Sequence, residues 1–189
     1  MENKLITRNA VLLTEKDPVE RDGVRGGKLI PFRFNTRTDG NENGYVYDPG
    51  CFDAFIERYY EANGISPLFC IQHNENLDHI AGRVLSIESD DETGEIRGVA
   101  WLAPSCLHYD KVLEMIQDKI FTHVSDCEMF DKYEVLEDGR IRVIEASLIH
   151  VSLVTMPSDT GARIAANKKF TFGNGKAKAE AVAEDDFMG

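Results

Sequence analysis

The stretch RIRVIEASLIHVSLVTM, residues 140–156, predicts one long β-strand, because β-branched residues recur along it and no glycine or proline interrupts it. Strict alternation places His150 on the face opposite to Val151 and Leu153. A buried imidazole in so apolar a strand needs a hydrogen-bond partner. His150 is therefore either a satisfied core residue or part of a polar site.

The segments on either side extend this strand into a mainly antiparallel sheet. KYEVLE (132–137) meets it at a turn formed by Asp138 and Gly139. Upstream, the strands 82–88 and 95–103 flank SDDETG, which predicts a hairpin. Further strands are expected over 4–15, 26–35 and 66–74, and an exposed loop over 37–44.

Two amphipathic helices interrupt the strands. Residues 48–64 have apolar side chains at helical spacing, with Asn63 and Gly64 as the C-terminal stop. Residues 110–120 predict a second helix, with Asp110 as its N-cap. The expected fold class is α+β and mainly antiparallel β, as a barrel or sandwich with helices packed outside.

Composition limits the function. Of the 189 residues, 42% are hydrophobic and 29% charged, which is typical of a soluble globular domain. The formal net charge of −12 argues against nucleic-acid binding, and no apolar run predicts a membrane span or a signal peptide. We expect one domain over 1–167 and a flexible or marginally helical tail over 168–189. The four cysteines are expected to be reduced thiols.

The stretch FTHVSDCEMF, residues 121–130, combines a histidine, a serine and a cysteine. One interpretation is a zinc site, because these residues and an upstream pair offer two thiolates and two imidazoles. Its four ligands would be Cys70, His73, His123 and Cys127. A buried structural thiol is the more common role of a residue such as Cys70.

A second interpretation is nucleophilic catalysis by Ser125 or Cys127, with a histidine as the base. His73 is the preferred base, because it follows an apolar strand at the point where that strand reaches the surface. Alternation points Asp126 away from Ser125 and places Cys127 on the same face as Ser125. His150 remains open between a core and a catalytic role.

Five motifs in order resemble the prohead maturation proteases of tailed phages, which are related in fold and mechanism to the herpesvirus capsid protease, assemblin. They are DPGCF (48–52), PLFCIQHN (67–74), HIAGRV (79–84), HVSDCEMF (123–130) and LIHVSLVTMPSDTGARI (148–164). The resemblance spans roughly residues 5 to 165. It implies a herpesvirus-protease-like β-barrel and no metal or other cofactor.

The resemblance implies a role for each matching residue. Ser125 takes the place of the nucleophile, His73 that of the general base, and His150 that of the third triad member, which gives the Ser-His-His arrangement of assemblin. Ser125 is followed by Asp126, Cys127 and Glu128, where the family usually has a run that contains glycine. For the oxyanion, the resemblance suggests an arginine, and we expect Arg163 or Arg142.

The resemblance implies a serine endopeptidase that cleaves scaffold and major capsid protein segments inside the assembling prohead, in the host cytoplasm. It also implies self-association, with a dimer as the expected form. Nucleic-acid and membrane partners are not expected. An alternative is a non-catalytic assembly or scaffold protein that retains the protease fold, and a lesser one is a cysteine protease that uses Cys127.

Overall fold

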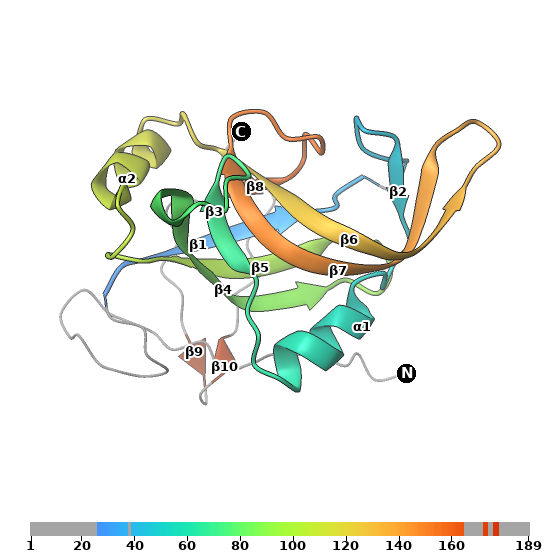
Figure 1. Ribbon diagram of the computed structural model, residues 1–189, viewed down its shortest axis with the longest axis horizontal. Coiled ribbons are helices and arrows are strands. Elements are labelled where there is room, and N and C mark those ends of the chain that lie inside the picture. The colour runs from blue at the N-terminus through green and yellow to red at the C-terminus, as the bar shows by residue number, and fades with distance from the viewer. Residues whose placement is uncertain (1–25, 38, 165–171, 174–175, 178–189) are drawn as a thin grey trace.

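The computed structural model describes residues 26–37, 39–164, 172–173 and 176–177, shown in colour in Figure 1. Within that part of the chain, strands account for most of the regular structure, and helices are few and short. The strands are β1 Lys28–Phe34, β2 Tyr45–Tyr47, β3 Leu68–Ile71, β4 Ile80–Ser89, β5 Ile96–Leu102, β6 His123–Val135, β7 Ile141–Val154, β8 Arg163–Ile164, β9 Phe172–Gly173 and β10 Lys176–Ala177. The helices are α1 Asp53–Phe55, which continues as a π-helical segment Ile56–Glu61, a 3₁₀ turn Leu77–His79, and α2 Tyr109–Gln117.

Seven strands close into a barrel. Their order is β7, β3, β4, β5, β1, β8 and β6, and pairing of β6 with β7 completes the ring. Most neighbours are antiparallel, whereas β3 runs parallel to β7. The short strand β2 adds to the free end of β7, also in parallel. The expected mainly antiparallel barrel is confirmed at this level.

The β6–β7 hairpin is the longest pairing in the barrel and carries the polar residues of interest. Its register runs from His123 opposite Val154 to Val135 opposite Ile141. Figure 1 shows the hairpin curving across the barrel and projecting beyond it at its turn. The last part of β7 pairs with β6 along one edge and with β3 along the other. β7 therefore lies between the strand of Ser125 and the strand that leads into His73.

Apolar side chains fill the barrel interior. Among the largest fully buried ones are Phe32, Phe34, Phe69, Val84, Leu102 and Leu153. Each such side chain contributes about 1.5–3 kcal/mol by leaving water. The helices lie outside the ring of strands in Figure 1, and α2 buries Val112 and Ile116. The interior is thus a packed core, and a polar site belongs at the barrel wall.

Most of the predicted elements are confirmed, with three differences. The helix α2 begins at Tyr109 after His108, so Asp110 lies in the first turn and is not the N-cap. The strand expected over 132–137 is the end of the longer β6. The helix expected over 48–64 is shorter and largely π-helical.

Two predictions concern the ends of the chain. The strand expected over 4–15 lies outside the described residues. So does most of the expected tail, 168–189, within which the pairing of β9 with β10 is described. In the described part of the chain, no helix is long and apolar enough to cross a membrane.

Candidate functional site

The site is built on a strained turn at the end of β3. Residues Ile71 to Asn74 form a two-residue turn closed by the Asn74 N–H, which donates to the Ile71 carbonyl oxygen over 3.2 Å. Its central residues, Gln72 and His73, both have a φ of 54°. Two consecutive positive φ angles define a type I′ turn, for which glycine and asparagine are favoured. The left-handed backbone costs about 1–2 kcal/mol for each such residue, and strain of this kind is concentrated at functional sites.

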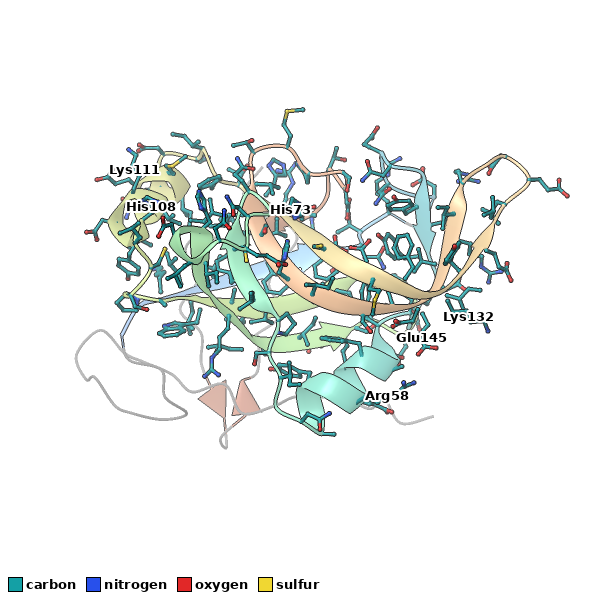
Figure 2. The ribbon with its side chains drawn as sticks, in the orientation of Figure 1. Arg58, His73, His108, Lys111, Lys132 and Glu145 are labelled. Carbon is teal, nitrogen blue, oxygen red and sulfur yellow. The ribbon has the colours of Figure 1, made fainter. Side chains whose placement is uncertain are left out.

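Hydrogen bonds to β7 hold this turn in place. The Gln72 N–H donates to the carbonyl oxygen of Leu153 over 2.9 Å, which continues the pairing of β3 with β7. The His73 N–H donates to Oγ of Ser152 over 3.2 Å. The Gln72 side-chain amide reaches Oγ1 of Thr155 over 3.3 Å. These bonds set His73 beside β7, near the end of β3, where Figure 2 labels it.

His73 meets His150 across these strands. Nδ1 of His73 lies 3.0 Å from Nε2 of His150, and the ring centroids are 5.3 Å apart. His150 is 2% exposed, whereas His73 is partly open to solvent and has its ring partly covered by the neighbouring strands. Burial, and to a lesser extent the neighbouring His150, lowers the pKa of His73 below its ordinary value. A neutral His73 is the form that can accept a proton.

The second nitrogen of His150 is also engaged. Nδ1 of His150 lies 2.7 Å from Oε1 of Glu75, two residues beyond His73. Sequence reasoning missed Glu75 because an acidic residue in a loop normally faces water. Its position depends on the turn at Gln72 and His73, which folds the chain back over β7. Both ring nitrogens of the buried His150 thus have partners, an arrangement that fits a satisfied core histidine and a catalytic one alike.

Ser125 lies next to this pair by strand register. It is directly opposite Ser152, and Cys127 is directly opposite His150. Directly opposed residues of an antiparallel pair share a face, with Cβ atoms about 4.5–5.5 Å apart. Ser152 connects the two residues, because it lies opposite Ser125 and its Oγ accepts a hydrogen bond from the His73 N–H.

The hydroxyl of Ser125 is directed to its own strand and not to His73. Ser125 is 8% exposed, and its hydroxyl donates to the Asp126 carbonyl oxygen over a long 3.5 Å. No hydrogen bond joins Ser125 to His73. Catalytic hydrogen bonds are often long or misaligned in a free enzyme and shorten when substrate binds. A catalytic role for Ser125 would require rotation about its Cα–Cβ bond toward His73.

The acidic residues after Ser125 lie on the other side of β6. Asp126 is opposite Val151, a core residue, and Glu128 accepts a hydrogen bond from the Tyr47 hydroxyl over 2.5 Å. Burial raises the pKa of Asp126 well above its usual range, and the nearby Glu128 carboxylate raises it further. Asp126 therefore favours the neutral acid and faces away from Ser125, which agrees with the alternation of the sequence.

Cys127 shares the face of Ser125 but is poorly suited to act as a nucleophile. Burial raises the pKa of its thiol, and the carboxylates of Glu128, Glu75 and Asp126 raise it further. Reactive cysteines have the opposite surroundings, with positive groups that stabilise the thiolate. All four cysteines are free thiols in the structure.

The two arginines expected near the oxyanion are in different places. Arg163 on β8 is opposite His123 on β6; burial lowers the pKa of His123, and the positive charge of Arg163 lowers it further. Ser125 is the diagonal neighbour of Arg163, about 7–8 Å away in such a ladder. Arg142 is opposite Glu134, nine positions along β6 from Ser125, or about 30 Å of strand. It forms two bonds to the Asp48 carboxylate, 2.8 and 2.9 Å long, so the structure does not bring Arg142 to the site.

The suggested zinc ligands do not converge. His123 and Cys127 share a face of β6, as expected, but four positions along a strand are about 13 Å apart. The four ligands would need to lie within about 2.3 Å of one ion. Among the described residues, no three histidine, cysteine or acidic side chains are arranged to hold a metal ion.

The comparisons with known proteins add no relative. No model of a known protein family matches this chain, and the search of curated proteins likewise finds no match. The function is therefore inferred from the motifs and from the geometry around His73, His150 and Ser125.

Proposed function

We propose that this protein is a serine endopeptidase in which Ser125 is the nucleophile, His73 the general base and His150 the residue that orients the base. The observation that carries this proposal is the 3.0 Å contact between Nδ1 of His73 and Nε2 of His150, beside a serine on the adjoining strand. A nucleophile, a base and an orienting group within one cross-strand neighbourhood are the parts that acyl transfer requires.

The chemistry follows from which nitrogen of each ring is occupied. Because Nδ1 of His73 is bound to His150, Nε2 of His73 remains to accept the proton of the Ser125 hydroxyl. Oγ of Ser125 attacks the peptide carbonyl, and the His73 imidazolium then returns the proton to the leaving amine. A water molecule then attacks the acyl-enzyme, with His73 again as the base. The bond to Oγ of Ser125 breaks, His73 returns the proton to Oγ, and the acyl group leaves as a carboxylic acid. The lowered pKa of His73 keeps the base neutral at neutral pH.

Arg163 is the proposed donor to the oxyanion. Its Cα is the diagonal neighbour of Ser125 on the same face, and its long side chain carries a positive guanidinium, the kind of group that stabilises a developing oxyanion. The carboxylates of Asp126 and Glu128 would oppose that charge if they shared the face of Ser125. Their position on the other face of β6 is compatible with catalysis.

The substrate class rests on the motif resemblance. We propose that the enzyme cleaves segments of scaffold and major capsid proteins during phage head maturation, inside the prohead, and that it self-associates as a dimer. The barrel with helices outside is compatible with a herpesvirus-protease-like fold. A neutral histidine as third member, with less electrostatic assistance than a carboxylate, favours a slow enzyme that relies on high local concentration.

Digestion of a peptide library tests the endopeptidase proposal without knowledge of the natural substrate. Mass spectrometry is expected to find internal cleavages with the wild type and none with Ser125→Ala. Ser147→Ala is the matched control, because Ser147 lies on β7 and its hydroxyl donates to Asp131 at 2.6 Å, away from the site. Equal cleavage by wild type and Ser125→Ala would refute the proposal.

The alternative is a non-catalytic assembly protein that keeps the protease fold. Its support is the long hydrogen bond of the Ser125 hydroxyl to Asp126, which leaves the nucleophile unengaged by the base. Co-expression with the cognate capsid protein separates the two functions. The alternative predicts a stable complex of uncleaved proteins, identical for wild type and Ser125→Ala.

A further inference from the structure

The hydrogen-bonded chain that starts at His73 ends on Glu75. Oε1 of Glu75 lies 2.7 Å from Nδ1 of His150, and Nε2 of His150 lies 3.0 Å from Nδ1 of His73. A carboxylate accepts hydrogen bonds and cannot donate, whereas a neutral imidazole has one donor nitrogen and one acceptor nitrogen. Because Glu75 can only accept, it fixes the donor and the acceptor in both hydrogen bonds, the one from His150 to Glu75 and the one between His73 and His150.

The direction can be followed from one residue to the next. With Glu75 as acceptor, Nδ1 of His150 carries the hydrogen, and Nε2 of a neutral His150 has a lone pair. That lone pair accepts a hydrogen from Nδ1 of His73, which leaves Nε2 of His73 with a lone pair. This is the nitrogen that must accept the proton of the Ser125 hydroxyl.

We propose that Glu75 is a positioning residue that fixes the tautomers of His150 and His73, so that Nε2 of His73 is left unprotonated. The inference rests on the proposed hydrolase function. Without Glu75, His150 is free to carry its hydrogen on Nε2. His73 would then have to accept at Nδ1 and carry its own hydrogen on Nε2, which is the wrong tautomer for a base.

Glu75 also places a negative charge beyond the neutral third member of the triad, farther from the base than a carboxylate at the third position would be. When His73 takes the proton from Ser125, the new imidazolium is joined through His150 to the Glu75 carboxylate. Burial raises the pKa values of the neighbouring thiols of Cys70 on β3 and Cys127 on β6, and the charge of Glu75 raises them further. Both thiols are therefore neutral, and Glu75 supplies the local charge that opposes the imidazolium.

Nitrogen-15 NMR of the histidine rings tests the tautomers directly, without enzyme activity. Ser125→Ala protein would be labelled in its five histidines and measured at a pH where the rings are neutral. Both His73 and His150 are expected to carry hydrogen on Nδ1, and Glu75→Ala is expected to move the hydrogen of His150 to Nε2. Unchanged tautomers in Glu75→Ala, or a hydrogen on Nε2 of His150 with Glu75 present, would overturn the inference.

The reaction rate gives a second readout. A fluorophosphonate probe is expected to label Ser125 about 10- to 100-fold more slowly in Glu75→Ala, by analogy with the loss seen when the partner that orients a metal-binding histidine is removed. Asp78→Ala, a change of another exposed carboxylate in the same loop, is the matched control and should label like the wild type. Equal rates for Glu75→Ala and wild type would overturn the inference.

The two tests separate this inference from the proposed function. If the wild type is not labelled at all, the hydrolase proposal fails, and the NMR experiment still decides whether Glu75 sets the tautomers. If labelling proceeds normally and Glu75→Ala changes neither tautomers nor rate, only the role of Glu75 fails. Glu75 is 51% exposed, so its replacement is expected to leave the fold intact.

Discussion

Nδ1 of His73 and Nε2 of His150 lie 3.0 Å apart although the two residues are separated by 77 positions in the chain. The parallel pairing of β3 with β7 creates this contact, because it places Leu68 opposite His150 and brings the end of β3 alongside Ser152 and Leu153. A tight turn then returns His73 over the strand. The contact is thus a product of the β3–β7 pairing and of the turn that follows β3.

The acid limb of the pH profile reports the pKa of the base. Since burial and the neighbouring His150 lower the pKa of His73 below its ordinary 6.5, the rate is expected to remain high down to mildly acidic pH. Protonation of His73 then removes the acceptor. Labelling of Ser125 by a fluorophosphonate across pH 4.5–9 should give a midpoint below about 6.5. A midpoint above 7 would contradict this assignment of the base.

Replacement of Asp126 by asparagine should stabilise the protein at high pH. The raised pKa of Asp126 means that the folded state holds a proton that the unfolded chain has lost above about pH 4. Stability therefore falls as pH rises from there through the folded pKa. Between the unfolded and folded pKa values, each pH unit lowers the free energy of unfolding by about 1.4 kcal/mol. Asparagine has nearly the same shape as aspartate and does not ionise, so the variant does not lose this stability.

Thermal unfolding at several pH values measures the effect of Asp126→Asn. The variant should unfold at a higher temperature than wild type at pH 8, and the difference should shrink toward pH 4. Glu137→Gln, which changes an exposed carboxylate in the β6–β7 turn, serves as the control. If the difference in unfolding temperature between the variant and wild type stayed constant across the pH range, Asp126 would not be protonated in the folded protein. Because Asp126 faces away from Ser125, labelling of Ser125 should be unchanged.

Cys127→Ser should retain full activity. The thiol has a raised pKa and lies among carboxylates, so little thiolate is present at neutral pH. Iodoacetamide should accordingly modify Cys127 more slowly than a free cysteine at pH 7.5, as followed by peptide mass spectrometry. Loss of peptide cleavage in Cys127→Ser, with Ser125→Ala still active, would instead identify a cysteine protease.

Arg163 and Arg142 form a matched pair of variants. Removing an oxyanion donor usually costs about 10²- to 10³-fold in rate, so Arg163→Gln should slow Ser125 labelling by about that factor. Arg142→Gln should leave the rate unchanged, because Arg142 is bound to Asp48 at the far end of the hairpin. Equal effects of the two substitutions would mean that Arg163 does not act on the oxyanion.

Residue types and alternation predicted a good part of this site. The need of His150 for a partner followed from an imidazole in an apolar strand, and the position of Asp126 on the face opposite to Ser125 followed from period-two alternation. Both are properties of a single strand. The barrel followed in the same way, from several strand patterns with turn residues between them.

Properties that depend on two strands at once could not be predicted in this way. Arg163 and Arg142 were equivalent in sequence, and only the register of β6 with β8 and β7 separates them. Glu75 was unrecognisable for the same reason. Its contact with His150 requires the left-handed Gln72 and His73, residues that do not ordinarily signal a type I′ turn.

Peptide mapping after reaction with a fluorophosphonate tests the central claim most directly, since it needs no natural substrate. The phosphorus forms a bond to Oγ of Ser125, fluoride leaves, and His73 accepts the proton. The adduct is expected on Ser125 in the wild type and at least about 100-fold less of it in His73→Gln at equal time. An adduct elsewhere, no adduct, or equal labelling in His73→Gln would contradict a serine hydrolase built on Ser125 and His73.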